Sequence, residues 1–109
     1  MLFSLRLEAD NDTFNRHRIY QLDVERDLLG DVLVVITHGR KGQPLHERSV
    51  WVPDLSAAHA LVRSKLRRRA SAPRRIGCSY RVTELVAADD PTPFFLDPAA
   101  ARRMAAALG

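Results

Sequence analysis

The chain has 109 residues, and its 17 Lys and Arg against 13 Asp and Glu give a formal net charge of +4. This length suits one folded domain and disfavours a two-domain enzyme with a cleft. Hydrophobic residues make up 46% of the chain and charged residues 28%, a composition typical of a folded protein rather than a disordered tail. The single cysteine, Cys78, excludes a disulfide within the chain. We therefore expect a single-domain cytoplasmic protein without a secretory signal or a membrane span.

The first part of the chain predicts strands. Alternation of apolar and polar residues indicates a strand over residues 2–8, which the turn-forming residues 10–12 should end. Alternation resumes at Arg18 and places a second apolar face on Tyr20, Leu22 and Val24. We expect this strand to lead into a loop with an apolar anchor at residues 28–31.

A hairpin follows. Residues 32–37 are continuously apolar and β-branched up to Thr37, which is typical of a central strand buried on both faces. Two glycines in residues 39–44 predict a turn, and alternation over residues 45–52 predicts the returning strand.

One helix and one further strand are expected next. Pro53 ends the sheet run, and Asp54 or Ser56 can serve as the helix N-cap. Residues 70–73 should end the helix, and residues 80–85 predict a last short strand. The helix has an apolar stripe, Ala58, Leu61, Val62 and Leu66, and a separate line that we expect to be exposed, His59, Arg63 and Arg67.

The composition changes after Val86. Residues 89–93 predict a linker, residues 94–96 an apolar plug, and Asp97 a cap for a helix that runs to Leu108. The expected fold class is α+β: a twisted antiparallel sheet of about five strands with one helix packed on a face, plus a C-terminal helical appendage. Residues 1–85 should form the domain, with 86–109 as linker and helix of the same compact unit.

The charge is segregated along the chain. Residues 55–83 contain no Asp or Glu but eight basic residues, Arg63, Lys65, Arg67, Arg68, Arg69, Arg74, Arg75 and Arg81. Such a field attracts a polyanion, and nucleic acid is the natural candidate. However, the chain has 15 Arg, 2 Lys and 14 Ala, as a GC-rich bacterial genome would encode, so the basic run can also be a solvated face. Charge alone leaves both interpretations open.

Several short motifs in order resemble the WGR domain family over residues 1–85. They are Asn15-Arg16-His17-Arg18-Ile19-Tyr20, Asp27-Leu28-Leu29-Gly30-Asp31, His38-Gly39-Arg40-Lys41-Gly42, and an Ala-rich helix with basic residues before Gly77 and Tyr80. The resemblance implies an antiparallel sheet flanked by a helix. It also implies a role in binding DNA, since the family's domain helps poly(ADP-ribose) polymerases to bind DNA ends and also occurs as small free-standing bacterial proteins.

The family's Trp-Gly-Arg triplet reads His38-Gly39-Arg40 here. Gly39 and Arg40 carry over directly, whereas His38 occupies the position of the Trp that packs near the terminal nucleotide. A histidine there can stack weakly or form a hydrogen bond with phosphate.

The favoured function is therefore non-catalytic nucleic-acid binding, with DNA as the favoured partner, through phosphate contacts of little sequence specificity. The candidate nucleic-acid-binding residues are His38, Gly39, Arg40, Lys41, Arg63, Arg67, Arg74 and Arg75. Structural alternatives remain open: Arg40 can close the hairpin with Glu47, and basic residues at the end of a helix complement its dipole. We expect Trp51, like Tyr20 and Tyr80, to belong to the core.

Other classes of function find less support. The four histidines and Cys78 show no metal-ligand spacing, and no motif of a catalytic site is present, so we expect no enzyme, no cofactor and no metal. The alternative is a protein-interaction module, monomeric or homodimeric, whose DNA binding was lost with the Trp. Its basic face would dock an acidic partner, with apolar contacts from residues 94–96 or the terminal helix.

Overall fold

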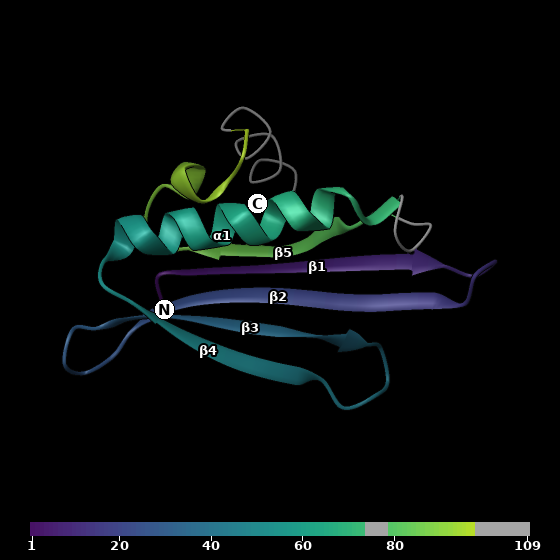
Figure 1. Ribbon diagram of the computed structural model, residues 1–109, viewed down its shortest axis with the longest axis horizontal. Helices are drawn as coiled ribbons and strands as arrows, with labels where there is room; N and C mark the ends of the chain where they lie inside the picture. The colour runs from purple at the N-terminus through teal and green to yellow at the C-terminus, as the bar shows by residue number, and fades with distance from the viewer. Residues whose placement is uncertain (74–78, 98–109) are drawn as a thin grey trace.

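The computed structural model describes residues 1–73 and 79–97, which form a five-stranded antiparallel sheet with a helix across it (Figure 1). The elements are β1 (Phe3–Asn11), β2 (Arg16–Arg26), β3 (Val32–Arg40), β4 (His46–Val52), α1 (Leu55–Ala70), β5 (Arg81–Ala87) and the 3₁₀-helix η1 (Thr92–Phe94). The strand order is β4-β3-β2-β1-β5. The first four strands are therefore neighbours both in the chain and in the sheet. In the chain, α1 connects β4, at one edge of the sheet, to β5, at the other edge. The predicted α+β class, with about five antiparallel strands and one helix on a face, is confirmed.

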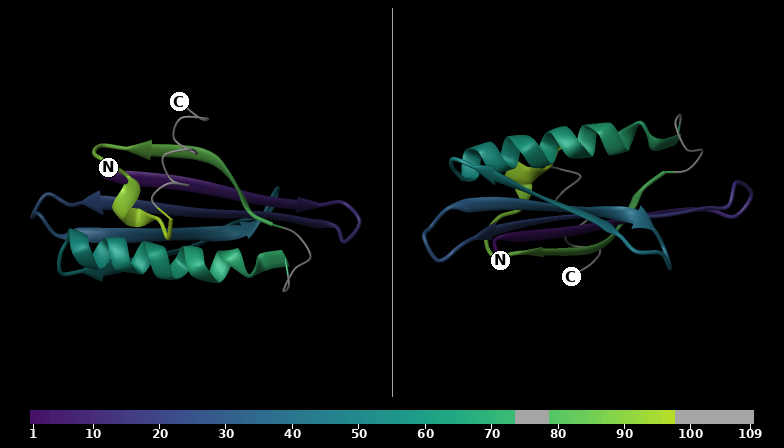
Figure 2. Two further views of the ribbon diagram at one scale, coloured as in Figure 1. Left: turned by 90° about the horizontal axis from the view of Figure 1, so that it is seen from above. Right: turned by 60° about the horizontal axis from the view of Figure 1, so that its bottom comes forward.

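Each strand directs alternate side chains to two different faces of the sheet. On one face, Leu5 of β1 pairs with Leu22 of β2, which in turn pairs with Ile36 of β3. This face lies under α1 and η1 (Figure 2), and it forms the core together with buried Ala58 and Val62 of the helix. We call it the helix face, and the opposite side the open face.

The segment after β5 completes the core. Phe94 stacks on Phe3 with ring centroids 4.0 Å apart, and Phe95 meets Phe3 edge-on at 6.0 Å. Both phenylalanines are buried, so the predicted apolar plug at residues 94–96 is confirmed for two of its three residues. His59 and Arg63 of α1 hold this segment: the His59 ring lies edge-on to Phe94, and Arg63 donates to the Pro93 carbonyl. Our expectation of an exposed line was wrong for His59 and Arg63, which are only partly exposed because η1 packs against them, and it is confirmed for Arg67.

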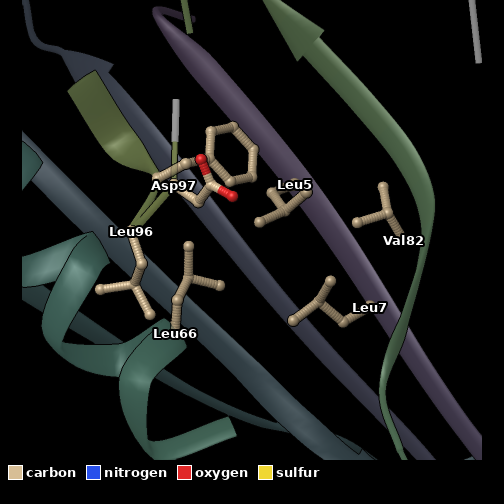
Figure 3. Close-up of a pocket in the computed structure, with 7 residues that line it drawn as sticks. Leu5, Leu7, Leu66, Val82, Leu96 and Asp97 are labelled. Carbon is tan, nitrogen blue, oxygen red and sulfur yellow. The ribbon is translucent and has the colours of Figure 1, made fainter. Parts of the chain in front are cut away.

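An apolar cavity of about 210 Å³ remains between α1, β1 and β5. Figure 3 shows Leu5 and Leu7 of β1, Val82 of β5 and Leu66 of α1 around this space, with Leu96 and Asp97 beside it. The helix therefore covers the β1–β5 side of the core less completely than the centre of the sheet.

The first turn forms later than predicted. We expected residues 10–12 to end the first strand, but β1 continues to Asn11, and Asp10 stays in the ladder opposite His17. Basic side chains on the open face contact the Asp10 carboxylate there. The turn falls on the following residues, where the Asn15 amide donates to the Asp12 carbonyl and Asn15 has a φ of 50°.

Two expectations about apolar burial were also wrong. In β3, Val32, Val34 and Ile36 are buried, but the alternate residues are only partly buried, because they lie on the open face. Trp51 lies on the same open face, in edge strand β4, and is 59% exposed rather than part of the core.

The loop between β2 and β3 has no apolar anchor. Leu28 is 105% and Leu29 88% exposed. The Asp27 carboxylate closes the loop instead, by accepting hydrogen bonds from the amides of Leu29 and Asp31, both at 2.9 Å.

Asp54 is the N-cap of α1, as predicted, and its carboxylate accepts from the Ala57 amide at 2.8 Å. The predicted C-terminal helix lies outside the described residues. In the part of the chain that the structure describes, α1 and η1 both lack the length and apolar character needed to cross a bilayer.

Candidate nucleic-acid interface

A cavity of about 290 Å³ lies between the C-terminal half of α1 and strands β2, β3 and β4. Its lining residues are Tyr20, Ile36, His38, Arg48, Lys65, Arg68 and Arg69. Four of these seven side chains are basic, one is histidine, and none is a carboxylate. We call this site the cationic cavity.

Strand register and helical periodicity bring the basic residues together. In the sheet, Arg48 pairs with Ile36, and the neighbouring pair on the same face is His38 with His46. In α1, residues 65, 68 and 69 have the i, i+3, i+4 spacing that places side chains on one side of a helix. Two separate segments therefore contribute cations to one space.

Arg69 is a partly buried cation of the cavity that packs against an aromatic ring. Its guanidinium carbon lies 4.2 Å from the centroid of the Tyr20 ring, a cation–π contact. Its Nε atom is buried without a hydrogen-bond partner. A buried N–H donor without an acceptor costs free energy.

The cations also disfavour one another. The pKa of Lys65 is lowered by partial burial and further by Arg48, Arg69 and Arg68. The only ion pairs that the structure shows between its described residues involve other basic side chains, so no carboxylate within 4.0 Å balances Arg48, Lys65 or Arg69. An incoming anion would relieve this repulsion.

The triplet residues occupy different positions around the cavity. The His38 side chain lies at its rim, with its ring centroid 5.5 Å from that of His46 and 6.4 Å from that of Tyr20. The pKa of His38 is lowered by desolvation and then by neighbouring positive charge. Gly39 has a φ of 156°, and a Cβ built there would come within 2.9 Å of Leu45 Cδ2, so this position favours glycine for backbone reasons.

Arg40 is held by the β1–β2 turn rather than by Glu47. Its guanidinium donates to the Asn15 carbonyl at 2.7 Å and to Asn15 Oδ1 at 2.9 Å. Both acceptors are neutral, so Arg40 keeps an uncompensated charge. It pairs with Arg18 of β2 in the register next to the pair of His38 and Tyr20, on the helix face.

Lys41 lies on the other side of the sheet. Its Nζ contacts Glu8 at 2.7 Å and Asp10 at 2.8 Å, and the two carboxylates raise its pKa. Lys41 therefore belongs to an ion-pair cluster on the open face and not to the cationic cavity.

The remaining candidates either lie on α1 outside the cavity lining or follow α1 in the sequence. Arg67 is exposed on α1 but does not line the cavity, and Arg63 is occupied by its bond to the η1 segment. Arg74 and Arg75 lie outside the described residues.

Sequence reasoning did not select four cavity residues, Arg48, Lys65, Arg68 and Arg69. The last three lie within the basic run that we noted, and the helix dipole was the alternative explanation for Arg68 and Arg69. Arg48 had a usable signal, since it shares the strand alternation of Val50 and Val52 and must lie on the same face as they do.

Among the described residues, no group of three or more His, Cys, Asp or Glu side chains is arranged to hold a metal ion. No family model, curated protein or solved structure matches this chain.

Proposed function

We propose that this chain is a non-catalytic nucleic-acid-binding domain of the WGR type, which contacts DNA through its phosphates with little sequence specificity. The cationic cavity carries the proposal. Basic side chains from β4 and α1 converge on one space, and none of the lining residues that the structure describes is a carboxylate. Phosphate oxygens supply negative charge and acceptors together.

The surface around the cavity extends the site beyond one phosphate. Arg18 and Arg40 lie on the same face of the sheet, one register pair beyond Tyr20 and His38, and Arg67 is exposed on α1. A polyanion that placed one phosphate in the cavity would meet further cations along its backbone. These contacts are to phosphate rather than to base edges, so the affinity should depend on salt more than on sequence.

The resemblance to the WGR family supports DNA as the nucleic acid. His38 occupies the position of the family's Trp, and it lies at the rim of the cationic cavity. The antiparallel sheet flanked by one helix is the architecture that the resemblance implies.

The test is fluorescence anisotropy with a labelled blunt-ended DNA duplex at about 50 mM and about 200 mM salt. The variants are Arg48→Gln and Lys65→Gln, which remove cavity charges, and Arg26→Gln as the matched control. Arg26 lies at the far end of β2 and donates to the Gly30 carbonyl, away from the cavity.

We expect binding that weakens with salt, and each cavity variant should reduce the slope of log affinity against log salt by about 1. The control should bind like the wild type. Absence of binding at low salt, or an equal loss in control and cavity variants, would refute the assignment.

One observation favours the second candidate, a protein-interaction module. Leu28 and Leu29 project from a loop closed by hydrogen bonds and are almost fully exposed. Phe94 and Phe95, by contrast, are buried in the core and cannot supply the apolar contact expected from residues 94–96. An acidic polypeptide as competitor in the same titration separates the candidates, because it should displace DNA only weakly if phosphate is the ligand.

A further inference from the structure

His38 stands among positively charged and aromatic groups from each strand and helix around the cationic cavity. β4 contributes His46 and Arg48, β2 contributes Arg18 and Tyr20, and α1 contributes Lys65, Arg68 and Arg69. Its own strand adds Arg40 two residues further on. Within residues 1–73 and 79–97, no carboxylate lines this space. Of the seven lining residues that the structure describes, His38 belongs to the residue type that changes charge closest to neutral pH.

We propose that the cationic cavity binds one phosphate group of the nucleic acid together with one proton, which His38 takes up from solvent. The affinity for nucleic acid then rises as the pH falls through the range in which His38 titrates. This inference rests on the proposed nucleic-acid binding and adds a regulation of the same site.

The hydrogen-bonding capacity of imidazole gives the first argument. A neutral ring has one N–H donor and one nitrogen that can only accept, whereas the protonated ring has two donors. A phosphate diester offers only acceptors to the cavity. Protonation of His38 therefore adds a donor and a positive charge toward the ligand, and it removes a lone pair that would face phosphate oxygens.

Linkage gives the second argument and its sign. In the free protein the pKa of His38 lies below its ordinary value of 6.5, because of desolvation and of charge on His46, Arg69, Arg18 and Arg48. A bound phosphate places negative charge beside the same ring and raises its pKa. Protons are therefore taken up on binding, and affinity falls as the pH rises between the free and the bound pKa values. One proton limits the change to about tenfold per pH unit.

The experiment repeats the duplex titration between about pH 5.5 and about pH 7.5 at constant ionic strength. The variants are His38→Gln, which keeps a polar side chain without a titrating charge, and His59→Gln as the matched control. His59 packs on Phe94, on the η1 side of α1, and does not line the cavity. Circular dichroism of each variant across the range confirms that the fold persists.

We expect the affinity of the wild type to rise between about threefold and about thirtyfold toward the lower pH. His59→Gln should keep this dependence, and His38→Gln should lose most of it. His46→Gln supplies a further readout: removal of a neighbouring ring that lowers the pKa of His38 should move the dependence to higher pH.

NMR titration of the His38 ring gives a direct measurement. The pKa of the His38 ring should rise when duplex is added. If phosphates beside the bound one contribute, inorganic phosphate should raise this pKa less than the duplex does. Salt-dependent binding without any pH dependence, or an equal dependence in His38→Gln, would overturn the inference and leave nucleic-acid binding standing. Absence of duplex binding at every pH would instead refute the proposed function.

Discussion

Asp10 is the centre of an ion-pair cluster on the open face of the sheet. Its carboxylate accepts from Lys41 Nζ and Arg81 Nη1, both at 2.8 Å, and lies 2.9 Å from His17 Nδ1. These contacts join β1 to the segment after β3 and to β5. Hydrogen bonds from Lys41, then from His17 and Arg81, hold the pKa of Asp10 well below its ordinary value of 3.8.

This lowered pKa predicts a specific acid response. An ionised carboxylate that is stabilised in the folded state contributes stability above its unfolded pKa, and the contribution is lost as the pH falls toward the lowered value. Asp10→Asn should therefore be less stable than the wild type at neutral pH, and the difference should shrink below about pH 4. Urea unfolding at several pH values measures this. A constant difference down to about pH 2 would contradict it.

The Asp10→Asn variant also tests which face of the sheet contacts nucleic acid. Because Lys41 pairs with Asp10 and Glu8 on the open face, Asp10→Asn should leave duplex affinity at neutral pH within about twofold of the wild type. A large change in affinity would mean that Lys41 contacts nucleic acid. Anisotropy titration of the folded variant provides this measurement.

Residue identities were only partly informative about the site. The triplet pattern pointed to His38, which does lie at the rim of the cationic cavity. It also pointed to Lys41, three positions further along the chain. Because side chains alternate between the two faces, Lys41 lies on the open face whereas His38 lies on the helix face. A run of adjacent basic residues cannot show which sheet face each one reaches until the register is known.

At the scale of elements, α1 was the most predictable. Its N-cap, its apolar stripe and its end before Pro73 all follow from local chemistry, and the structure bears them out. The β3–β4 hairpin was equally local, with Gly42 at a φ of 80° in its turn. What local pattern could not give is which sheet face the helix covers, since this depends on pairings between distant segments.

The cap of α1 gives a direct test of this local account. Asp54→Ala removes the acceptor for the Ala57 amide and should lower the free energy of unfolding by about 1 kcal/mol. Asp54→Asn keeps an acceptor and should lose much less. Equal losses in the two variants, measured by urea unfolding, would show that the cap bond does not contribute.

Because of the apolar cavity beside β1, we expect the side chains around it to differ in how much their truncation lowers the free energy of unfolding. Leu5 is fully buried and lines this cavity, so Leu5→Ala would enlarge a space that the neighbouring strands cannot close. We expect a loss within about 2–5 kcal/mol, toward the upper end. Leu96 lines the same cavity but is 44% exposed, so Leu96→Ala should lower the free energy of unfolding by only about 1 kcal/mol. Similar losses in the two variants would contradict this view of the cavity.

The whole molecule separates its charge by sheet face. The open face pairs Glu8 and Asp10 with nearby cations, whereas the cationic cavity on the helix face contains no carboxylate among its lining residues. The sequence showed a basic run and a more acidic remainder. Alternation within β4 puts Arg48 on the face of Val50, and the position of α1 over that face brings Arg48 beside the helix cations. Burial of the hydrophobic face thus also concentrates positive charge at one end of that face.

This arrangement predicts opposite responses of stability and affinity to acid. The pKa values of His38 and His59 are both lowered in the folded protein, chiefly by desolvation. The unfolded chain therefore binds more protons near pH 6, and the stability of the free protein should fall as the pH drops from about 7 to about 5. Affinity for nucleic acid should rise over the same interval.

Thermal unfolding at several pH values, with and without saturating duplex, tests both responses together. The melting temperature of the free wild type should fall on acidification, and the increase caused by duplex should become larger. His59→Gln should weaken the first effect and keep the second, because His59 contacts Phe94 rather than the cavity. A duplex-induced increase that stays constant from about pH 7 to about pH 5 would show that the cationic cavity binds phosphate without taking up a proton.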